Sequence, residues 1–248
     1  MTKPGRTAIA ILADRSRATR PVRAALRAGL AGMLSDQQDR ADQQDSANQQ
    51  DTADQQSTDV LATVVPTGAT MPALRPVADV TVPALRSRGT AAVRDDLGVL
   101  ITDLGAALST MPEEERPSRV LVLVVGAGTA GTRWSRDAIA DLVGAQHRDY
   151  AWEFAFVGLG TDTAAAAELG IGHALTCTPS EEGVRAGLAA ASAFLSRARD
   201  GQPWAPVEGF VDAERAAAAA PADETAATAS WWQRLLGRKP EMATSEQA

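Results

Sequence analysis

The chain has 248 residues, one cysteine, and 31 acidic against 24 basic side chains, which gives a net charge of −7. The lone Cys177 excludes a framework of intrachain disulfides, and the 45% apolar content is that of a core-forming protein from a reducing compartment. An acidic balance without a Lys/Arg block excludes a generic nucleic-acid binder, because neutralising phosphates needs a basic surface. The first apolar run ends at Asp14 after six residues, too short for a membrane span or a signal-peptide core, so we expect a cytoplasmic protein.

Short apolar runs alternate with helical periodicities along the chain. The clearest run is RVLVLVV at 119–125, a composition typical of a parallel strand that is covered on both faces. The predicted strands are 7–13, 60–65, a short edge strand at 80–82, 119–125, 152–157 and 171–176. The predicted helices are 21–34, one opened by Thr90, 136–143, 162–169, and a last one with Thr178 as N-cap, Pro179 in its first turn and Glu181 closing a capping box.

This alternation predicts an α/β fold with a doubly wound, mostly parallel open sheet flanked by helices, as a single domain over residues 7–198. In such a sheet the binding loops lie beyond the carboxyl ends of the strands.

Two segments differ in composition from this domain. Residues 36–58 repeat the hexapeptide DQQDxA, carry a net charge of −5 and contain alanine as their only apolar type, so we expect a low-complexity, disordered or loosely helical insert. The alternative for this insert is an interaction tail or a weak cation sponge. Residues 201–248 contain Pro203, Pro206 and an Ala/Thr-rich run, and we expect a flexible tail.

The sequence GAGTAG, from Gly126 to Gly131, matches G-x-G-x-x-G directly after a predicted strand. This pattern is typical of a loop that holds a dinucleotide pyrophosphate at a helix N-terminus. However, at least two strands and two helices precede it, and the next strand ends in Gly158-Leu159-Gly160, where a ribose-binding acid is expected. A nucleotide-binding α/β protein is therefore the alternative function.

Two other loops carry a more informative pattern: Asp14-Arg15-Ser16-Arg17-Ala18 after the first strand, and Arg88-Gly89-Thr90 before a helix. In order and spacing, together with GAG at 126–128 and WEFAFVGLGTDTAAAAELGI at 152–171, they make residues 7–198 resemble a bacterial von Willebrand factor type A (VWA) domain. That family builds a metal-ion-dependent adhesion site from D-x-S-x-S, a Thr of a second loop and an Asp after the fourth strand. The resemblance places Asp14, Ser16 and Thr90 in this site.

The site departs from the family pattern at two positions, because Ala18 stands where the second Ser belongs and Ala127 where the Asp belongs. Mg²⁺ prefers near-octahedral oxygen coordination, and here one hydroxyl and one carboxylate are missing. We therefore expect a degenerate site with no cofactor, or at most weak Mg²⁺ binding. The alternative is that Asp14, Ser16 and Thr90 serve only as helix caps and loop hydrogen-bond partners.

The same loops are rich in arginine. Their arginines are Arg15, Arg17, Arg20, Arg86, Arg88 and Arg133. Guanidinium groups can bind a partner's carboxylate through two hydrogen bonds, so Arg15, Arg17 and Arg88 are candidate partner-binding residues. The alternative is that they are ordinary solvated arginines of the surface. The family resemblance implies a scaffold or adaptor role, beside an AAA-type ATPase or in a stress-response system.

A second candidate partner-binding element lies near the C-terminus, in the amphipathic peptide 231–239. Its apolar residues Trp231, Trp232, Leu235 and Leu236 share one helical face beside Arg234, Arg238 and Lys239. This pattern is typical of a tethered docking peptide for a protein groove or an anionic membrane surface, and the alternative is that it folds back onto the domain.

No enzyme signature is visible in the sequence. His147 and His173 lie in different segments without a second ligand at metal spacing, and no G-x-S-x-G or H-E-x-x-H motif occurs. We interpret Asp95 and Asp96 as favourable to a helix dipole, and Cys177 as a small buried residue. The sequence thus favours a non-enzymatic protein–protein interaction domain.

Overall fold

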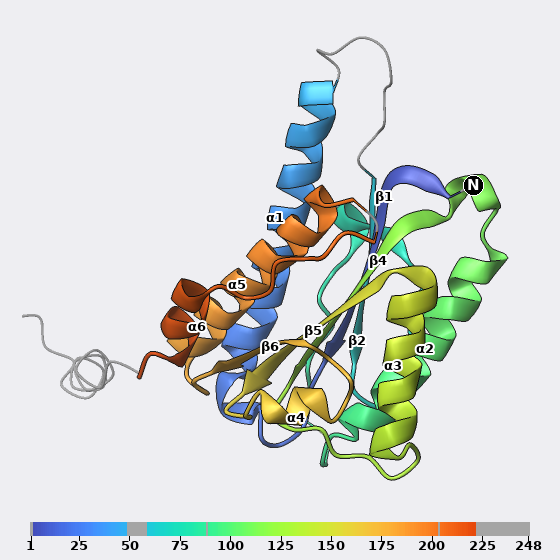
Figure 1. Cartoon of the computed structure of the whole chain (residues 1–248). Coiled ribbons are helices and arrows are strands. Elements are labelled where there is room, and N and C mark those ends of the chain that lie inside the picture. The colour runs from blue at the N-terminus through green and yellow to red at the C-terminus, as the bar shows by residue number, and fades with distance from the viewer. Residues whose placement is uncertain (1, 49–58, 88, 203, 222–248) are drawn as a thin grey trace, which may run out of the picture.

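The computed structural model describes residues 2–48, 59–87, 89–202 and 204–221. Its centre is a six-stranded sheet in the order β3-β2-β1-β4-β5-β6, as Figure 1 shows. The strands are β1 (Lys3–Ala13), β2 (Val60–Pro66), β3 (Arg75–Pro76), β4 (Pro117–Gly126), β5 (Trp152–Leu159) and β6 (His173–Cys177). All neighbours pair in parallel except β3, which runs antiparallel to β2.

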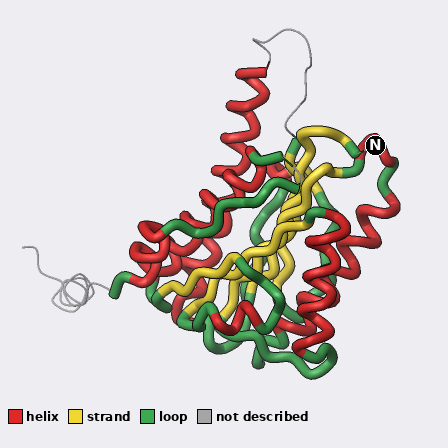
Figure 2. Tube along the Cα trace, viewed as in Figure 1, coloured by secondary structure: helices red, strands yellow, loops and turns green. Residues whose placement is uncertain are grey.

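Helices cover both faces of the sheet (Figure 2). On one face lie α1 (Arg23–Asn48), α5 (Glu181–Asp200) and α6 (Asp212–Ala219), and on the other lie α2 (Val93–Thr110), α3 (Arg136–Tyr150) and the short α4 (Ala164–Ala167). Three single turns of 3-10 helix occur at Arg20–Val22, Val77–Asp79 and Glu113–Glu115. This is the expected doubly wound α/β fold in one domain.

The strands show why two helical layers are needed. In β1, Ile9, Ile11 and Ala13 face the α1/α5 layer, whereas Ala8, Ala10 and Leu12 face the α2/α3 layer. Successive side chains alternate between faces, so a continuous apolar strand is buried only if both faces are covered. The apolar face of α2, from Val93 to Leu108, is buried, as is Cys177.

Three of the predicted local features are wrong. Residues 80–82 form no strand, because the edge strand is β3 at Arg75–Pro76. Thr90 does not open α2, which begins at Val93 with Ala92 as its N-cap. The N-cap of α5 is Ser180, whose hydroxyl accepts from the Gly183 amide at 3.0 Å, whereas the hydroxyl of Thr178 donates to carbonyls at the end of α6.

Of the two readings of the insert over 36–58, disordered or loosely helical, residues 36–48 take the helical one and continue α1 without a break. Gln37, Ala41 and Gln44 recur at helical spacing on the side that faces α5, and Gln37 and Ala41 are buried there. The amide of Gln37 donates to the Ser192 carbonyl at 3.1 Å, and the Arg199 guanidinium donates back to Gln37 Oε1 at 3.0 Å. The second half of α1 therefore packs on α5 through polar side chains, whereas the first half packs through apolar ones. Residues 49–58 lie outside the described residues.

The predicted start of the flexible tail, at residue 201, is also too early. Phe210 is buried with its ring 5.4 Å from that of Phe194, and α6 packs on α5 and β6. The amide of Thr178 donates to the Ala218 carbonyl at 2.9 Å, which joins α6 to the end of β6. The folded body thus extends to α6. Residues 222–248, including Trp231, Trp232, Leu235 and Leu236, lie outside the described residues.

Candidate functional site

Asp14 and Ser16 lie where β1 leaves the sheet, beside the end of β4. Strands β2 and β4 flank β1 on opposite sides, so this edge is the topological switch point of the sheet. The Asp14 amide donates to the Val125 carbonyl at 2.8 Å, which fixes the start of the loop against β4. The loop then turns inward, and both Asp14 and Ser16 are buried.

The Asp14 carboxylate is held by three donors. Its Oδ1 accepts from the Ser16 amide at 2.6 Å, and its Oδ2 accepts from the Ser16 hydroxyl at 3.2 Å and from the Ala127 amide at 3.0 Å. A Cβ at Gly126 would lie 3.3 Å from the Asp14 Cβ, so the absence of a side chain there lets β4 approach the carboxylate. Asp14 therefore joins the loops after β1 and β4.

These loops surround a surface hollow with a volume of about 510 Å³, which we call the β1–β4 hollow. Its lining residues are Asp14, Ser16, Arg17, Ala18, Gly89, Thr90, Ala91, Val93, Ala127, Gly128 and Ala130. The structure thus brings Asp14, Ser16 and Thr90 to one place, together with the two alanines that replace family ligands. The side chain of Thr90 is exposed at its rim.

The lining residues fit a divalent cation poorly. Among the described residues, Asp14 is the one carboxylate that lines the hollow, and both of its oxygens already accept hydrogen bonds. Mg²⁺ usually keeps several waters but needs carboxylate oxygens that are free to coordinate it. Across the described part of the chain, no group of three or more His, Cys, Asp and Glu side chains is arranged to hold a metal ion.

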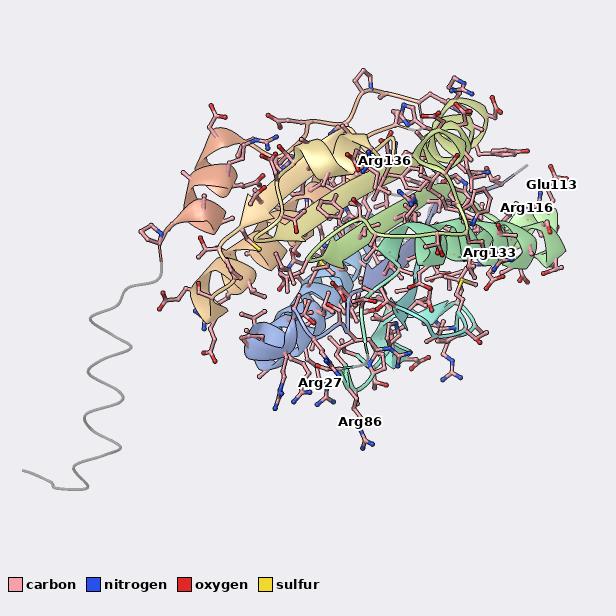
Figure 3. The ribbon with its side chains drawn as sticks, turned by 90° about the horizontal axis from the view of Figure 1, so that it is seen from below. Arg27, Arg86, Glu113, Arg116, Arg133 and Arg136 are labelled. Atoms are coloured by element: carbon pink, nitrogen blue, oxygen red, sulfur yellow. The ribbon has the colours of Figure 1, made fainter. Side chains whose placement is uncertain are left out.

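The arginines of these loops do not form a single patch. Figure 3 looks onto this edge of the sheet, with Arg27 and Arg86 on one side of the molecule and Arg133 on another. Arg15 turns away from the hollow, because its guanidinium donates to the carbonyls of Thr67 at 2.6 Å and Gly68 at 3.0 Å. Of the loop arginines in the described chain, Arg17 alone lines the hollow, and it is exposed. Arg88 lies outside the described residues.

The segment that directly follows the GAGTAG sequence binds a carboxylate of the protein itself. Asp95, in the first turn of α2, accepts from the amides of Thr132, Arg133 and Trp134 at 2.8 to 3.0 Å. Although burial alone would raise the Asp95 pKa, these three amides hold it below its ordinary value. Such a row of amides is an anion site, and here Asp95 fills it. Sequence reasoning assigned Asp95 only to the helix dipole.

The same contact explains one glycine of the GAGTAG sequence. A Cβ at Gly131 would lie 2.6 Å from Asp95 Oδ1, so only glycine allows this close approach. Helix α3 begins at Arg136, with its amides capped by Ser135, whose hydroxyl accepts from Ala138 at 3.1 Å. The acidic pair at 95–96 is visible in the sequence, but nothing in the sequence links it to the residues that follow GAGTAG.

Several solved structures are similar to this one at low sequence identity. The pilus adhesin SpaC from Lactobacillus rhamnosus GG, in an open conformation, superposes with a TM-score of 0.53 at 12% identity, over 75% of this chain and 29% of its own. Proximal thread matrix protein 1 from the mussel byssus gives a TM-score of 0.47 at 11% identity, over 77% of this chain and 46% of its own. BatB from Bacteroides thetaiotaomicron gives 0.45 at 11% identity, over 79% of this chain and 100% of its own.

This chain spans less than half the length of the first two of these proteins. No protein-family model and no curated protein matches its sequence. Within the described residues, no helix is both long enough and apolar enough to cross a bilayer. At 12% identity the likeness to SpaC shows the fold alone, which is a doubly wound α/β domain.

Proposed function

We propose that this chain is a non-enzymatic, VWA-like interaction domain that binds a partner protein at the β1–β4 hollow with little dependence on metal. The observation that carries the proposal is that Asp14, Ser16 and Thr90, which are distant in sequence, line one hollow at the switch point of the sheet. This is the edge where open α/β sheets bind their ligands. The order of the loops matches the family pattern that the sequence resembles.

The chemistry of the hollow supports a role without a metal. In the family pattern a bound cation takes a carboxylate from the partner, but here the Asp14 charge is already compensated by three donors. The exposed Arg17 guanidinium on the rim can instead take an Asp or Glu of the partner. Of the three arginines proposed as partner ligands, Arg17 keeps that role. Arg15 is already bonded to the loop after β2.

The proposal predicts that partner capture depends on Arg17 and not on divalent cations. Tagged wild-type protein, Arg17→Glu and the control Arg20→Glu are used to capture partners from an extract of the cells that encode the chain. Arg20 is a fitting control because it is equally exposed but does not line the hollow. We expect the Arg17→Glu variant to lose the partner that Arg20→Glu retains, with no effect of EDTA. Equal capture by both variants, or capture abolished by EDTA, contradicts the proposal.

Nucleotide binding at the GAGTAG loop, the alternative from sequence, has no supporting observation. The amides of Thr132, Arg133 and Trp134, which follow this loop, already donate to Asp95, and the Ala127 amide within it donates to Asp14.

A further inference from the structure

A hollow at the amino edge of the sheet collects the exposed aromatic side chains of the described chain. It has a volume of about 770 Å³ and lies between the C-terminal ends of α2 and α3, which cover the same face of the sheet (Figure 1). We call it the α2–α3 hollow. Val120 of β4 and Trp152 of β5 line it from the sheet, Leu108 lines it from α2, and Tyr150 lines it from α3.

The hollow exists because α2 and α3 are close at one end and separated at the other. Near the start of both helices, the indole of Trp134 packs so tightly on α2 that a Cβ at Gly98 would lie 2.4 Å from its Nε1. About two turns further along α2, Gly105 lines the hollow, and a Cβ there would meet no atom within 4 Å. The resulting space is within the range of roughly 300–1,000 Å³ that is typical of small-molecule sites.

Two unfavourable features of the surface meet at this hollow. Tyr150 and Trp204 are the large apolar side chains that the described chain leaves exposed, at 63% and 64%, and both line the hollow. Trp204 also has a φ of 69°, in the left-handed region that a bulky side chain rarely adopts. Neither ring packs on another aromatic ring among the described residues. A strained residue of this kind is typical of a ligand site, and both rings are available to a ligand.

The charges around the hollow favour a cation. Asp149 lines it from the last turn of α3, where the helix dipole also places partial negative charge, and its carboxylate has no hydrogen bond or ion pair within the described chain. Among the described residues, Arg116 is the one basic side chain that lines the hollow (Figure 3). Its guanidinium donates to the carbonyls of Leu108 at 3.0 Å and Met111 at 3.1 Å, at the end of α2. The charge of Arg116 is therefore used by α2, and that of Asp149 is left uncompensated.

We propose that the α2–α3 hollow binds a small organic cation that carries a trimethylammonium group. The faces of the Trp204 and Tyr150 rings attract a cation, and Asp149 supplies the opposite charge. A quaternary ammonium donates no hydrogen bond, so it can lie against the apolar surface of Val120 and Trp152. A primary ammonium or a guanidinium would leave donors unpaired on that surface, which is costly.

The test titrates the full-length protein with choline chloride at constant ionic strength. We expect calorimetry to show saturable binding of one choline. The neutral analogue 3,3-dimethylbutan-1-ol has nearly the same shape without the charge, and we expect no saturable binding of it over the same concentrations.

Variants locate the bound choline. Trp204→Leu and Tyr150→Leu keep an apolar side chain but remove the ring, so each should weaken choline binding about 2- to 30-fold, the effect of losing one cation–π contact. Asp149→Asn should also weaken it. The control Asp141→Asn removes another exposed carboxylate of α3 that does not line the hollow, and it should bind choline as wild type does.

Three results would overturn the proposal. The first is an absence of saturable choline binding. The second is equal binding of the neutral analogue, because the hollow would then be only an apolar cavity. The third is choline binding that is unchanged in Trp204→Leu and Tyr150→Leu, because it would then lie elsewhere on this acidic chain. Melting curves show whether each variant is folded, and both rings are exposed, so the core stays intact. The β1–β4 hollow lies at the other edge of the sheet, so these results are independent of partner capture through Arg17.

Discussion

Three carboxylates at the edges of the sheet have different surroundings. Asp14 and Asp95 each accept hydrogen bonds from backbone amides and thereby connect loops from different parts of the chain. Glu153 is buried without such donors. The sequence predicted the position of Asp14, because it directly follows an apolar strand. The role of Asp95 could not be predicted, since its three donors lie 37 to 39 residues away.

The burial of Glu153 has a consequence for stability. Its pKa is raised in the folded state, so folding favours the protonated form and the penalty grows as pH rises above the unfolded value of about 4.5. We expect Glu153→Gln to be more stable than wild type at pH 7, with an advantage that shrinks as pH falls towards 4. Urea unfolding across this pH range measures the difference. A variant that is less stable than wild type at pH 7 would contradict this account of Glu153.

At the scale of elements, strands were easier to predict than helix ends. The apolar runs of β1, β2, β4 and β5 are long enough to be recognised alone, because parallel strands between two helical layers are apolar on both faces. The second half of α1 was missed because its contact face consists of Gln37, Ala41 and Gln44 rather than large apolar residues. A periodicity of apolar residues does not detect a helix that packs through glutamine.

This polar contact can be tested in α1 itself. Gln37 is fully buried and bonds to both Ser192 and Arg199 of α5, and burial lowers the Arg199 pKa to about 10. Gln37→Ala removes the side-chain hydrogen bonds to Ser192 and Arg199 from this buried contact, so we expect a loss of about 1–3 kcal/mol in the free energy of unfolding. Gln43→Ala, at an exposed position of the same helix, is the control and should change little. Equal effects of the two substitutions in urea unfolding would show that the buried network is unimportant.

At the scale of the whole molecule, the two edges of the sheet carry different chemistry. The carboxyl edge joins loops that the sequence could assign, because each follows a recognisable strand. The opposite edge brings together Glu153, His147 and His173 from three elements, and this juxtaposition depends on the pairing of β5 with β6, in which Ala155 lies opposite His173. The one sequence signal was a lone Glu within the apolar run WEFAFVGL. The cluster therefore could not be predicted without the register of the sheet.

The C-terminal boundary of the folded body gives the last prediction. Residues 204–207 line a cavity beside Glu153 and Phe210 is buried. Helix α6 packs on β6, an edge strand whose free side would otherwise be open to pairing with another chain. Ending the chain after Gly201 removes Phe210, and burial of a Phe side chain contributes about 3–5 kcal/mol. With a shift of about 2–4 °C per kcal/mol at this size, we expect the melting temperature to fall by roughly 10 °C.

A chain that ends after Pro221 retains the whole of α6 and provides the matched comparison. It should melt at the same temperature as the full chain if the peptide 231–239 binds a partner rather than the domain. An equal fall for both truncations would mean instead that this peptide folds back onto the domain and stabilises it. Differential scanning calorimetry of the three chains, with light scattering to detect association through the exposed β6 edge, decides between these outcomes.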